Sequence, residues 1–256
     1  MAIVSICAIV KVKKPVEAAL MEKTFPLDAV SKISIIIPTL NEATQIATTI
    51  QNAQIANGIE IIIVDGGSQD NTLECAQNLG VKVFFSPQPG RAAQMNFGAT
   101  QATGDILLFL HADTQLPPHY DGLIRAALAQ PGVMAGAFQL GIDSPEMSLR
   151  LVEKMVIVRS RFFQLPYGDQ ALFLTQETFK TCGGFPDLPI MEDFEFVRRL
   201  KPQGKIVLVP ASVTTSARRW QKLGVFKTTI INQMIVLGYY LGVSPQQLRN
   251  WYRQQK

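Results

Sequence analysis

The stretch ISIIIPTLNE, residues 33–42, joins a short run rich in β-branched residues, at 33–37, to a polar segment that begins at Pro38. Three similar apolar runs follow, at residues 59–64, 81–85 and 106–110. Turn residues bound each run, and segments of helix length separate them, at residues 44–56, 75–79 and 92–102. This alternation predicts a parallel sheet of βαβ units, with Asn41 capping the first helix and Asp70 or Asn71 the second.

The regular alternation weakens after residue 110. Further strands are predicted at residues 133–140, 172–175 and 206–209, and further helices at 144–163 and 194–201. The sequence contains no internal repeat and no low-complexity linker. The predicted fold is therefore α/β, with one domain at residues 31–222, an N-terminal extension at residues 1–30 and a C-terminal amphipathic helical segment at residues 223–256.

The composition fits one large globular domain, because 47% of the 256 residues are hydrophobic and 17% are charged. Intrinsic disorder and a collagen-like chain are excluded. Cys7, Cys75 and Cys182 form no C-x-x-C spacing, so neither a structural zinc site nor a disulfide framework is predicted. We expect a reducing, cytosolic setting, since the apolar run near the start lacks the flanking residues of a secretory signal.

Charge is distributed unevenly along the chain. From Arg198 to the C-terminus there are eleven basic and no acidic residues, whereas the preceding part has thirteen basic and twenty acidic residues. Such a tail indicates an anionic partner: a diphosphate, a nucleic acid or membrane headgroups. The apolar stretch at 225–243 is interrupted by Lys227, Asn232 and Gln233, which favours a helix in the membrane interface or packed on the domain over a spanning helix.

Polar segments follow all four runs of the predicted parallel sheet: PTLNE, DGGSQD, SPQPGR and HADT. Ligands of such sheets bind beyond the carboxyl ends of the strands. In PTLNE, the side chains of Asn41 and Glu42 are expected to face a ligand; a plain turn with an asparagine cap is the alternative.

The segment VDGGSQDNT places Asp65 at the end of a strand, and Gly66 and Gly67 allow close approach of the backbone to a ligand before Ser68 and Asp70 open a helix. An acid here can capture the polar edge of a base or a ribose; a tight turn with caps is the alternative. The chain has neither a G-x-G-x-x-G dinucleotide motif nor a Walker phosphate-binding motif.

The segment GRAAQMN offers Arg91, Gln94 and Asn96 at the start of a helix, where they can hold phosphate or a base. An arginine on a solvated helix face is the alternative.

The segment LLFLHADT ends a buried strand in His111 and Asp113, which alternation along an extended segment places on the same side. This pair can bind a divalent cation together with substrate phosphates, and a histidine ligand suits Mn²⁺ more than Mg²⁺. The alternatives are that Asp113 caps the next helix and that His111 is a hydrogen-bonded structural residue.

Three later segments complete the predicted site. EDFEF places Glu192 and Asp193 before an amphipathic helix, where acids also meet the helix dipole favourably. YGDQ offers Asp169 and Gln170 as pocket residues. ARRW, residues 217–220, lies in the acid-free tail, where a solvated basic turn is the alternative.

These motifs, in this order over residues 33–220, resemble the inverting nucleotide-sugar glycosyltransferases of glycosyltransferase family 2. The resemblance implies a GT-A fold, a Rossmann-like and mostly parallel sheet flanked by helices. It implies that Asn41, Glu42 and Asp65 hold the base and ribose, and that Arg91 encloses the nucleotide.

The same resemblance assigns chemical roles. Asp113 matches the last acid of the D-x-D metal motif, with His111 in place of the first, and Asp193 matches the catalytic base, with Glu192 as the less favoured base. Arg219 and Trp220 resemble a reduced Q-x-x-R-W element that grips the diphosphate, although Ser216 replaces its glutamine. The predicted acceptor residues are Asp169 and Gln170. The full predicted nucleotide-sugar site is Pro38, Asn41, Glu42, Asp65, Gly67, Ser68, Arg91, Gln94, Ala112, Arg219 and Trp220.

The implied function is transfer of a sugar, with inversion, from a nucleotide-diphosphate sugar to an acceptor hydroxyl, with Mg²⁺ or Mn²⁺. A lipid or lipid-linked acceptor is consistent with the basic tail, and the expected location is the cytoplasm, including the inner face of the cell membrane if the tail meets lipid. The tail could instead complete the fold or form a dimer contact. A non-catalytic nucleotide-sugar binder or membrane-attached scaffold is the main alternative function. A sugar-nucleotide pyrophosphorylase would need a G-x-G-T-R loop that PTLNE lacks, and no nucleic-acid-binding module is recognisable.

Overall fold

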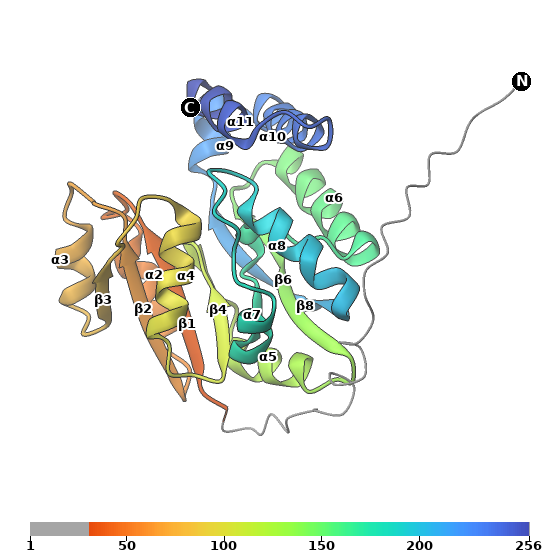
Figure 1. The fold of residues 1–256 in the computed structure, drawn as a ribbon. Helices are drawn as coiled ribbons and strands as arrows, with labels where there is room; N and C mark the ends of the chain where they lie inside the picture. The colour runs from red at the N-terminus through yellow and green to blue at the C-terminus, as the bar shows by residue number, and fades with distance from the viewer. Residues whose placement is uncertain (1–30, 256) are drawn as a thin grey trace, which may run out of the picture.

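The computed structural model describes residues 31–255, which form an eight-stranded sheet with helices on both faces (Figure 1). The strand order is β3-β2-β1-β4-β7-β6-β8-β5. The strands are β1 (Ile33–Thr39), β2 (Ile59–Asp65), β3 (Lys82–Phe85), β4 (Ile106–Phe109), β5 (Thr114–Gln115), β6 (Val133–Asp143), β7 (Phe173–Thr175) and β8 (Lys205–Ser216). The predicted N-terminal extension, residues 1–30, lies outside the described residues.

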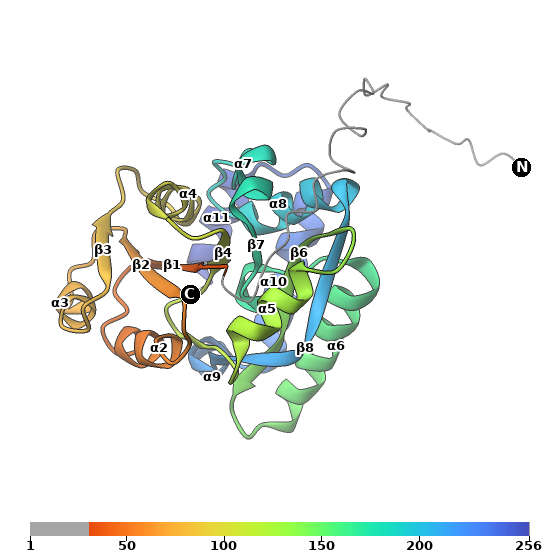
Figure 2. The ribbon, with the colours of Figure 1, turned by 90° about the horizontal axis from the view of Figure 1, so that it is seen from below.

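Helices connect most of these strands. The α-helices are α2 (Ile46–Ala53), α3 (Thr72–Gln77), α4 (Arg91–Gln101), α5 (Tyr120–Leu128), α6 (Met147–Phe163), α7 (Gln176–Thr181), α8 (Glu192–Leu200), α9 (Arg218–Leu223), α10 (Val225–Tyr240) and α11 (Pro245–Gln254). Two short 3-10 helices are η1 (Gly168–Gln170) and η2 (Lys201–Gln203). Seen from below, α4, α7 and α8 cover one face of the sheet and α2 covers the other (Figure 2).

Alternation along the strands produces two cores, one on each face of the sheet. Ile35 and Ile37 of β1 pack in the core that includes α2 and α5, whereas Ile36 packs in the core that includes α4, α7 and α8. All three side chains are fully buried, so the sheet is covered on both sides and its inner strands are almost continuously apolar.

The first four strands are parallel, and the carboxyl ends of β1, β2 and β3 are level, whereas β4 ends before the end of β1. Thr39 of β1 lies opposite Asp65 of β2, which lies opposite Phe85 of β3, and Ile36 of β1 lies opposite Phe109 of β4. The loops that follow these strands therefore leave the sheet at one edge, where the predicted site residues are found.

The structure confirms the α/β fold with flanking helices and corrects details of the prediction. The sheet is mixed, because β7 runs antiparallel to both β4 and β6, and β5 runs antiparallel to β8. The strands β6 and β8 are longer than predicted and pair in parallel with two register shifts. Helices α5, α7 and α9 and strand β5 were not predicted, because their short segments carry little periodicity of their own.

The predicted cap of the first helix is also corrected. Helix α2 begins at Ile46, and Asn41 lies four residues earlier than its cap residue, Gln45. Asn41 has a φ of 57°, and its side-chain oxygen accepts a hydrogen bond from the backbone nitrogen of Gln69. Asn41 thus joins two loops instead of capping a helix.

The C-terminal helices pack on the sheet domain above α8 (Figure 1). Ile235 of α10 and Leu248 of α11 share a buried cluster with Met191 and Phe194. Helix α10 is apolar on both its buried and exposed sides, because Ile231 and Ile235 are buried while Phe226 and Leu237 are exposed; the predicted amphipathic character therefore fails for α10. Within residues 31–255, no helix has the length and hydropathy needed to cross a membrane.

Candidate functional site

Hydrogen bonds join the loops that follow β1 and β2. The backbone nitrogen of Asn41 donates to Ser68 Oγ at 2.9 Å, and that of Gln69 donates to Asn41 Oδ1 at 2.8 Å. The backbone nitrogen of Glu42 also donates to Thr72 Oγ1 at 2.8 Å. These bonds place Asn41, Glu42 and Ser68 together at the carboxyl edge of the sheet.

Asp65 is 1% exposed, and its loop uses both carboxylate oxygens. Oδ1 accepts from the backbone nitrogens of Gly67 and Ser68, at 2.8 Å each, and Oδ2 accepts from the Ser68 and Thr39 hydroxyls. Gly67 has a φ of 100°, which glycine adopts without strain. Asp65 therefore shapes the turn, and direct binding of a nucleotide by Asp65 stays a prediction.

Gln94 and Ala112 make hydrogen bonds within the protein. The Gln94 side chain is buried, and its amide nitrogen donates to the carbonyl oxygens of Thr39 and Val64 at 2.8 Å each. Ala112 is also buried, and its carbonyl oxygen accepts from Thr49 Oγ1. The Gln94 amide nitrogen and the Ala112 carbonyl oxygen thus help to hold the strand ends in place, and binding of a nucleotide sugar by these two residues stays a prediction.

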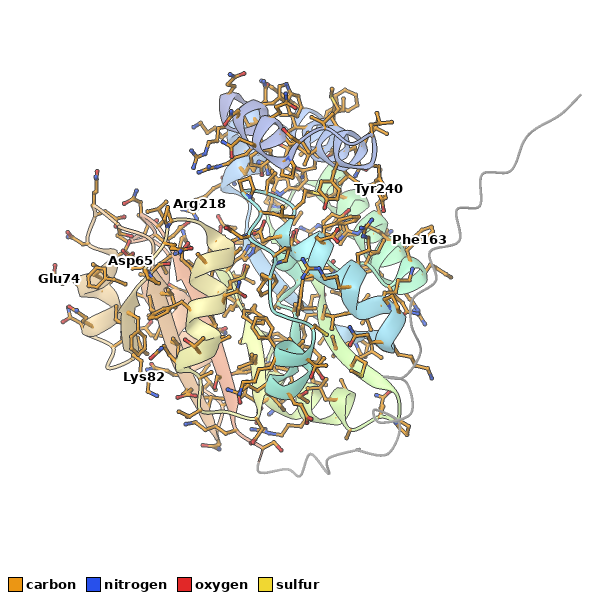
Figure 3. The ribbon with its side chains drawn as sticks, in the orientation of Figure 1. Asp65, Glu74, Lys82, Phe163, Arg218 and Tyr240 are labelled. Carbon is orange, nitrogen blue, oxygen red and sulfur yellow. The ribbon has the colours of Figure 1, made fainter. Side chains whose placement is uncertain are left out.

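Arg218 joins two of the predicted site acids. Its Nη2 donates to Glu42 Oε2 at 2.7 Å and to Asp113 Oδ2 at 3.0 Å. These three residues, named here the Arg218 cluster, have side chains that are 24–44% exposed. Burial acts to lower the pKa of the Arg218 guanidinium, but the two carboxylates outweigh this effect. The pKa of Arg218 is therefore raised above its ordinary value. Figure 3 shows Arg218 and Asp65 at the same edge of the molecule.

Arg91 joins the other predicted acids. Its Nε donates to Glu192 Oε1 at 2.5 Å, its Nη1 lies 3.0 Å from His111 Nε2, and its Nη2 lies 3.9 Å from Asp193 Oδ2. These four residues are named here the Arg91 cluster. Glu192 is 3% exposed, and its pairing with Arg91 makes it an anchor for that guanidinium.

Asp193 has a different setting from Glu192 although the two are adjacent. Its Oδ2 accepts from the backbone nitrogen of Gly168 at 2.7 Å, and its Oδ1 accepts from the backbone nitrogen of Phe194. A Cβ atom at Gly168 would lie 3.0 Å from Asp193 Oδ2 and 3.4 Å from His111 Nε2. Glycine thus allows the η1 backbone to approach both side chains. A small cavity is lined by Pro38, Arg91, His111, Gly168 and Asp193, among others.

The charges of the Arg91 cluster shift two pKa values in opposite directions. Burial acts to lower the pKa of Arg91, but the negative charges of Glu192 and Asp193 outweigh it and raise this pKa above its ordinary value. Burial and the positive charge of Arg91 lower the pKa of His111 to about 4, against the opposing charges of Asp113 and Asp193. His111 is therefore neutral at pH 7, and its Nε2 can accept a hydrogen bond from Arg91.

The sequence predicted that His111 and Asp113 lie on one side of an extended segment. The structure differs from this prediction. Strand β4 ends at Phe109, and a turn follows in which the Thr114 nitrogen donates to the His111 carbonyl oxygen. His111 contacts Arg91, whereas Asp113 contacts Arg218. Within residues 31–255, no group of three or more His, Cys, Asp and Glu side chains is arranged to hold a metal ion.

The side chain of Gln170 makes all its observed hydrogen bonds within the protein. It is completely buried, and its Oε1 accepts from Arg159, Ser160 and the Tyr167 nitrogen, while its Nε2 donates to the Phe138 carbonyl oxygen. Its neighbour Asp169 differs, since its Oδ1 is buried and has no hydrogen-bond partner in the described structure. Burial raises the pKa of Asp169.

The two arginines of ARRW point to different neighbours. Arg219 Nη1 donates to the Tyr252 hydroxyl, and its guanidinium lies 4.3 Å above the Tyr252 ring. Trp220 packs beside Val152 and Val156 of α6. Arg218, not Arg219, therefore reaches the site acids in this structure. Consecutive helical residues diverge by about 100°, and the sequence alone does not indicate which one faces the site.

Two residues near the candidate site, Tyr252 and Arg159, were not predicted from the sequence. Tyr252 of α11 lies close enough to Arg91, Asp169 and Asp193 for their charges to act on its hydroxyl, whose pKa is raised mainly by burial. Arg159 of α6 lies 3.4 Å above the Tyr167 ring and donates to Gln170. No local motif signals Tyr252, because only packing of the C-terminal helices brings it to the site.

Asn96, also considered from the sequence, is structural. Its side chain exchanges two hydrogen bonds with the backbone of Phe185, at 2.8 and 2.9 Å. It thereby joins α4 to the segment that leads to Glu192 and Asp193.

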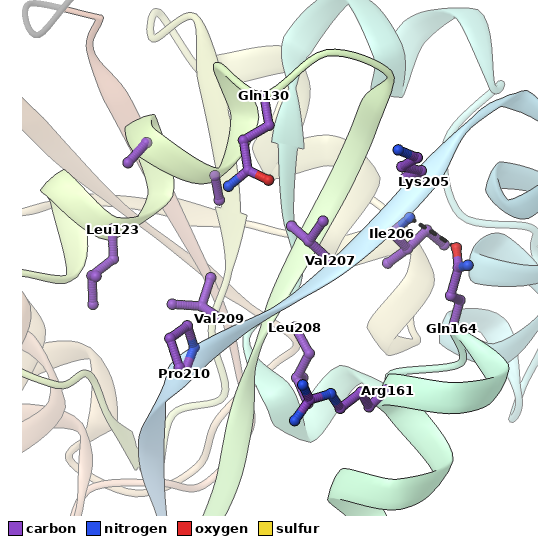
Figure 4. A pocket seen from close by; sticks show the side chains of 12 residues that line it. Leu123, Gln130, Arg161, Gln164, Lys205, Ile206, Val207, Leu208, Val209 and Pro210 are labelled. Carbon is purple, nitrogen blue, oxygen red and sulfur yellow. Dashed lines mark hydrogen bonds between the residues drawn. The ribbon is translucent and has the colours of Figure 1, made fainter.

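A larger groove of about 470 Å³ lies elsewhere, between α5, the end of α6 and β8 (Figure 4). Its lining includes Leu123, Gln130, Arg161, Gln164 and Lys205, and Gln164 accepts from the Ile206 nitrogen. None of the predicted site residues lines it, so size alone does not identify the functional site.

A family model places the chain among known proteins. The model of glycosyl transferase family 2 matches residues 34–185, more than half of the sequence. The chain belongs to this family, as its motifs predicted.

Curated relatives match over a shorter stretch. A glycosyltransferase of PGL/p-HBAD biosynthesis from Mycobacterium bovis is 40% identical over 96 residues, which cover 34% of this chain and 38% of the relative. An uncharacterised glycosyltransferase from a Nostoc species is 36% identical over 96 residues, which cover 34% of this chain and 30% of the relative. The chain thus matches about a third of the length of these relatives.

Solved structures show the same fold. Glucosyl-3-phosphoglycerate synthase from Mycobacterium tuberculosis, in complex with Mn²⁺, UDP and phosphoglyceric acid, aligns with a TM-score of 0.58 and 19% identity over 85% of this chain and 81% of that one. A mannosyltransferase from Pyrobaculum calidifontis, in complex with GDP-Man and Mn²⁺, aligns with a TM-score of 0.55 and 19% identity over 72% of this chain and 56% of that one.

Proposed function

We propose that this protein transfers a sugar, with inversion, from a nucleotide-diphosphate sugar to an acceptor hydroxyl in the presence of a divalent cation. One observation carries the proposal: the predicted site acids lie in two sets of contacts that adjoin each other at residues 111–113. Asp65 binds Ser68, which binds Asn41, and the adjacent Glu42 shares Arg218 with Asp113. The second set begins at His111, two residues before Asp113. His111 contacts Arg91, whose Nη2 lies 3.9 Å from Asp193 Oδ2.

Asp193 is the proposed catalytic base. Inverting transfer needs one group that accepts the proton of the acceptor hydroxyl, and a departing nucleoside diphosphate needs no acid because cations neutralise it. Of the two adjacent acids, Glu192 is held by Arg91 at 2.5 Å, whereas the nearest arginine nitrogen lies 3.9 Å from Asp193 Oδ2. Asp193 thus stays available for a proton.

The proposed diphosphate site lies at the Arg218 cluster. Two carboxylates 2.7 and 3.0 Å from one guanidinium nitrogen form a place where positive charge is stabilised. Mg²⁺ and Mn²⁺ suit such a donor set, because they bind few protein carboxylates together with substrate phosphates. Asp113 and Glu42 would hold the cation, which when bound neutralises charge on the leaving diphosphate. Structural neighbours in complex with Mn²⁺ or Mg²⁺ and UDP support a divalent cation beside a nucleoside diphosphate in this fold.

The acceptor is proposed to enter beside Asp169. Its Oδ1 is buried without a partner, which is costly unless a ligand supplies a donor. Arg219 Nε is likewise buried and unpartnered, and the charges of Arg219 and Asp169 both act on Tyr252. A hydroxyl donating to Asp169, with an anionic group near Arg219, would satisfy both atoms. This fits an acceptor that carries a phosphate, including a lipid-linked one.

The decisive experiment titrates the protein with a panel of nucleotide-diphosphate sugars in Mg²⁺, Mn²⁺ or EDTA. Donor binding is measured by calorimetry and slow donor hydrolysis by chromatography, and NMR determines the anomeric configuration of the product. We expect one donor to bind and hydrolyse only with a divalent cation, with inverted configuration. Binding of no donor, equal hydrolysis in EDTA, or a retained configuration would contradict the corresponding part of the proposal.

A further inference from the structure

Two neighbouring helices expose continuous rows of apolar side chains. On α6 the row is Met147, Leu151, Met155, Val158 and Phe162, at helical spacing and 50–81% exposed. On α10 it is Phe226, Ile230, Met234 and Leu237, 40–80% exposed. Monomeric proteins seldom expose contiguous apolar patches of this extent without a binding role.

The two rows belong to helices that pack on each other. Val152 and Val156, on the inner side of α6, share a cluster with Val225 at the start of α10. Figure 1 shows α10 lying above α6, on the part of the molecule farthest from β3 and α3. Among the described residues, nothing covers either row. These rows are named here the α6–α10 face.

Cations outnumber acids on the exposed sides of these two helices. On the exposed side of α6 the charged residues are Lys154 and Arg161, and on that of α10 Lys227. The only acid within the two helices is Glu153, which is paired with Arg150, and two further exposed acids, Asp143 and Glu146, lie just before α6. A second copy of the chain would place like charges opposite each other, whereas an anionic surface complements them.

We propose that the α6–α10 face docks the protein on an anionic lipid bilayer. An apolar helix side flanked by lysine and arginine lies in a membrane interface, with its apolar side chains among the acyl chains and its cations at the headgroups. The convex surfaces of two helices fit a deformable lipid layer. The sequence predicted a membrane contact only for the C-terminal tail, and this binding surface adds α6, which no motif had indicated. The proposed docking does not depend on the proposed sugar transfer.

Flotation of the full chain with vesicles tests the proposal. Vesicles of phosphatidylcholine with 30% phosphatidylglycerol are compared with pure phosphatidylcholine, at about 50 and 500 mM NaCl. We expect co-flotation on the anionic vesicles at low salt, weaker binding at high salt and little binding to the neutral ones, because the cations act through the surface potential.

Paired variants locate the contact. Leu151→Gln with Met155→Gln on α6, and Phe226→Gln with Leu237→Gln on α10, should each weaken vesicle binding at least about tenfold. The matched control is Ile55→Gln with Phe85→Gln, whose side chains are 79% and 65% exposed on other elements; it should bind like the wild type. Melting temperatures verify that all three pairs fold.

Three outcomes would overturn the proposal. These are absence of flotation of the wild type at low salt, flotation of both test pairs equal to that of the wild type, and a dimer in light scattering that the same substitutions abolish. The last would assign the face to a second copy. Donor binding is measured in parallel and should not change in any pair, so failure of docking is distinguishable from failure of the proposed transfer reaction.

Discussion

The Arg218 cluster and the Arg91 cluster are built alike but differ in burial. In each, one arginine reaches across the sequence to two carboxylates: Arg218 to Glu42 and Asp113, and Arg91 to Glu192 and Asp193. The two arginine side chains are similarly exposed, 44% and 40%. The carboxylates are 26% and 24% exposed around Arg218, but 3% and 15% exposed around Arg91.

This difference indicates which arginine can be exchanged. A carboxylate that keeps its contact with water loses little when its partner leaves, whereas a desolvated one requires a partner. We infer that Arg218 can yield its place to a cation and a diphosphate, while Arg91 permanently holds the segment that positions Asp193.

The largest expected effect follows from Asp193→Asn. Loss of a general base should reduce turnover by about 10² or more, while donor affinity changes little, because the amide keeps a similar size and its one oxygen can still accept from the backbone nitrogen of Gly168 or of Phe194. Single-turnover kinetics and donor calorimetry measure the two quantities. The matched control is Asp187→Asn, an exposed acid shortly before α8. Turnover equal to the wild type would reject Asp193 as the base.

A stability comparison tests the difference in burial directly. Glu192→Gln should lower the free energy of unfolding by about 1–3 kcal/mol, because it removes a charge-assisted hydrogen bond from a buried site. Glu42→Gln, in the more exposed cluster, should change it by less than about 0.5 kcal/mol. Urea denaturation at pH 7 measures both. Equal losses in the two variants would remove the distinction between the clusters.

The smallest expected effect concerns binding of Mn²⁺ without nucleotide. Arg218→Ala should tighten it about three- to tenfold, on the order of 1 kcal/mol, because Glu42 and Asp113 lose a competing positive charge. It should weaken binding of a nucleoside diphosphate. Electron paramagnetic resonance of free Mn²⁺ measures the first effect, and Arg198→Ala, an exposed arginine paired with Glu195, is the control. Unchanged or weaker Mn²⁺ binding would show that Arg218 does not compete with the cation.

The first half of the fold was predictable because its signal is local. Each of the first four strands is a short apolar run ended by a polar segment, and the structure places β1 to β4 within a residue or two of the predicted ranges. The prediction was less complete after residue 110. The two-residue strand β5 and the helices α5, α7 and α9 are defined by their contacts with the sheet and with other helices, which leave little pattern in so short a segment.

The site shows the same limit at the level of side chains. The sequence identified the loops that contain Glu42, Asp113, Glu192 and Asp193, because acids at strand ends and helix starts stand out. It did not indicate that the fold itself uses polar atoms of Asp65, Gln94 and Gln170 in hydrogen bonds, because their partners lie on other segments or on the backbone.

The sequence by itself determined the order of strands and helices in the first half and the family to which the chain belongs, because hydrophobic periodicity and short motifs act over a few neighbouring residues. The tertiary structure alone decided that Arg218 reaches Glu42 and Asp113, that Arg91 holds Glu192, and that Tyr252 lies near Asp193. These partners are separated by dozens to more than a hundred residues. Their contacts exist only because packing of the sheet and helices places the side chains within hydrogen-bonding or Coulombic range.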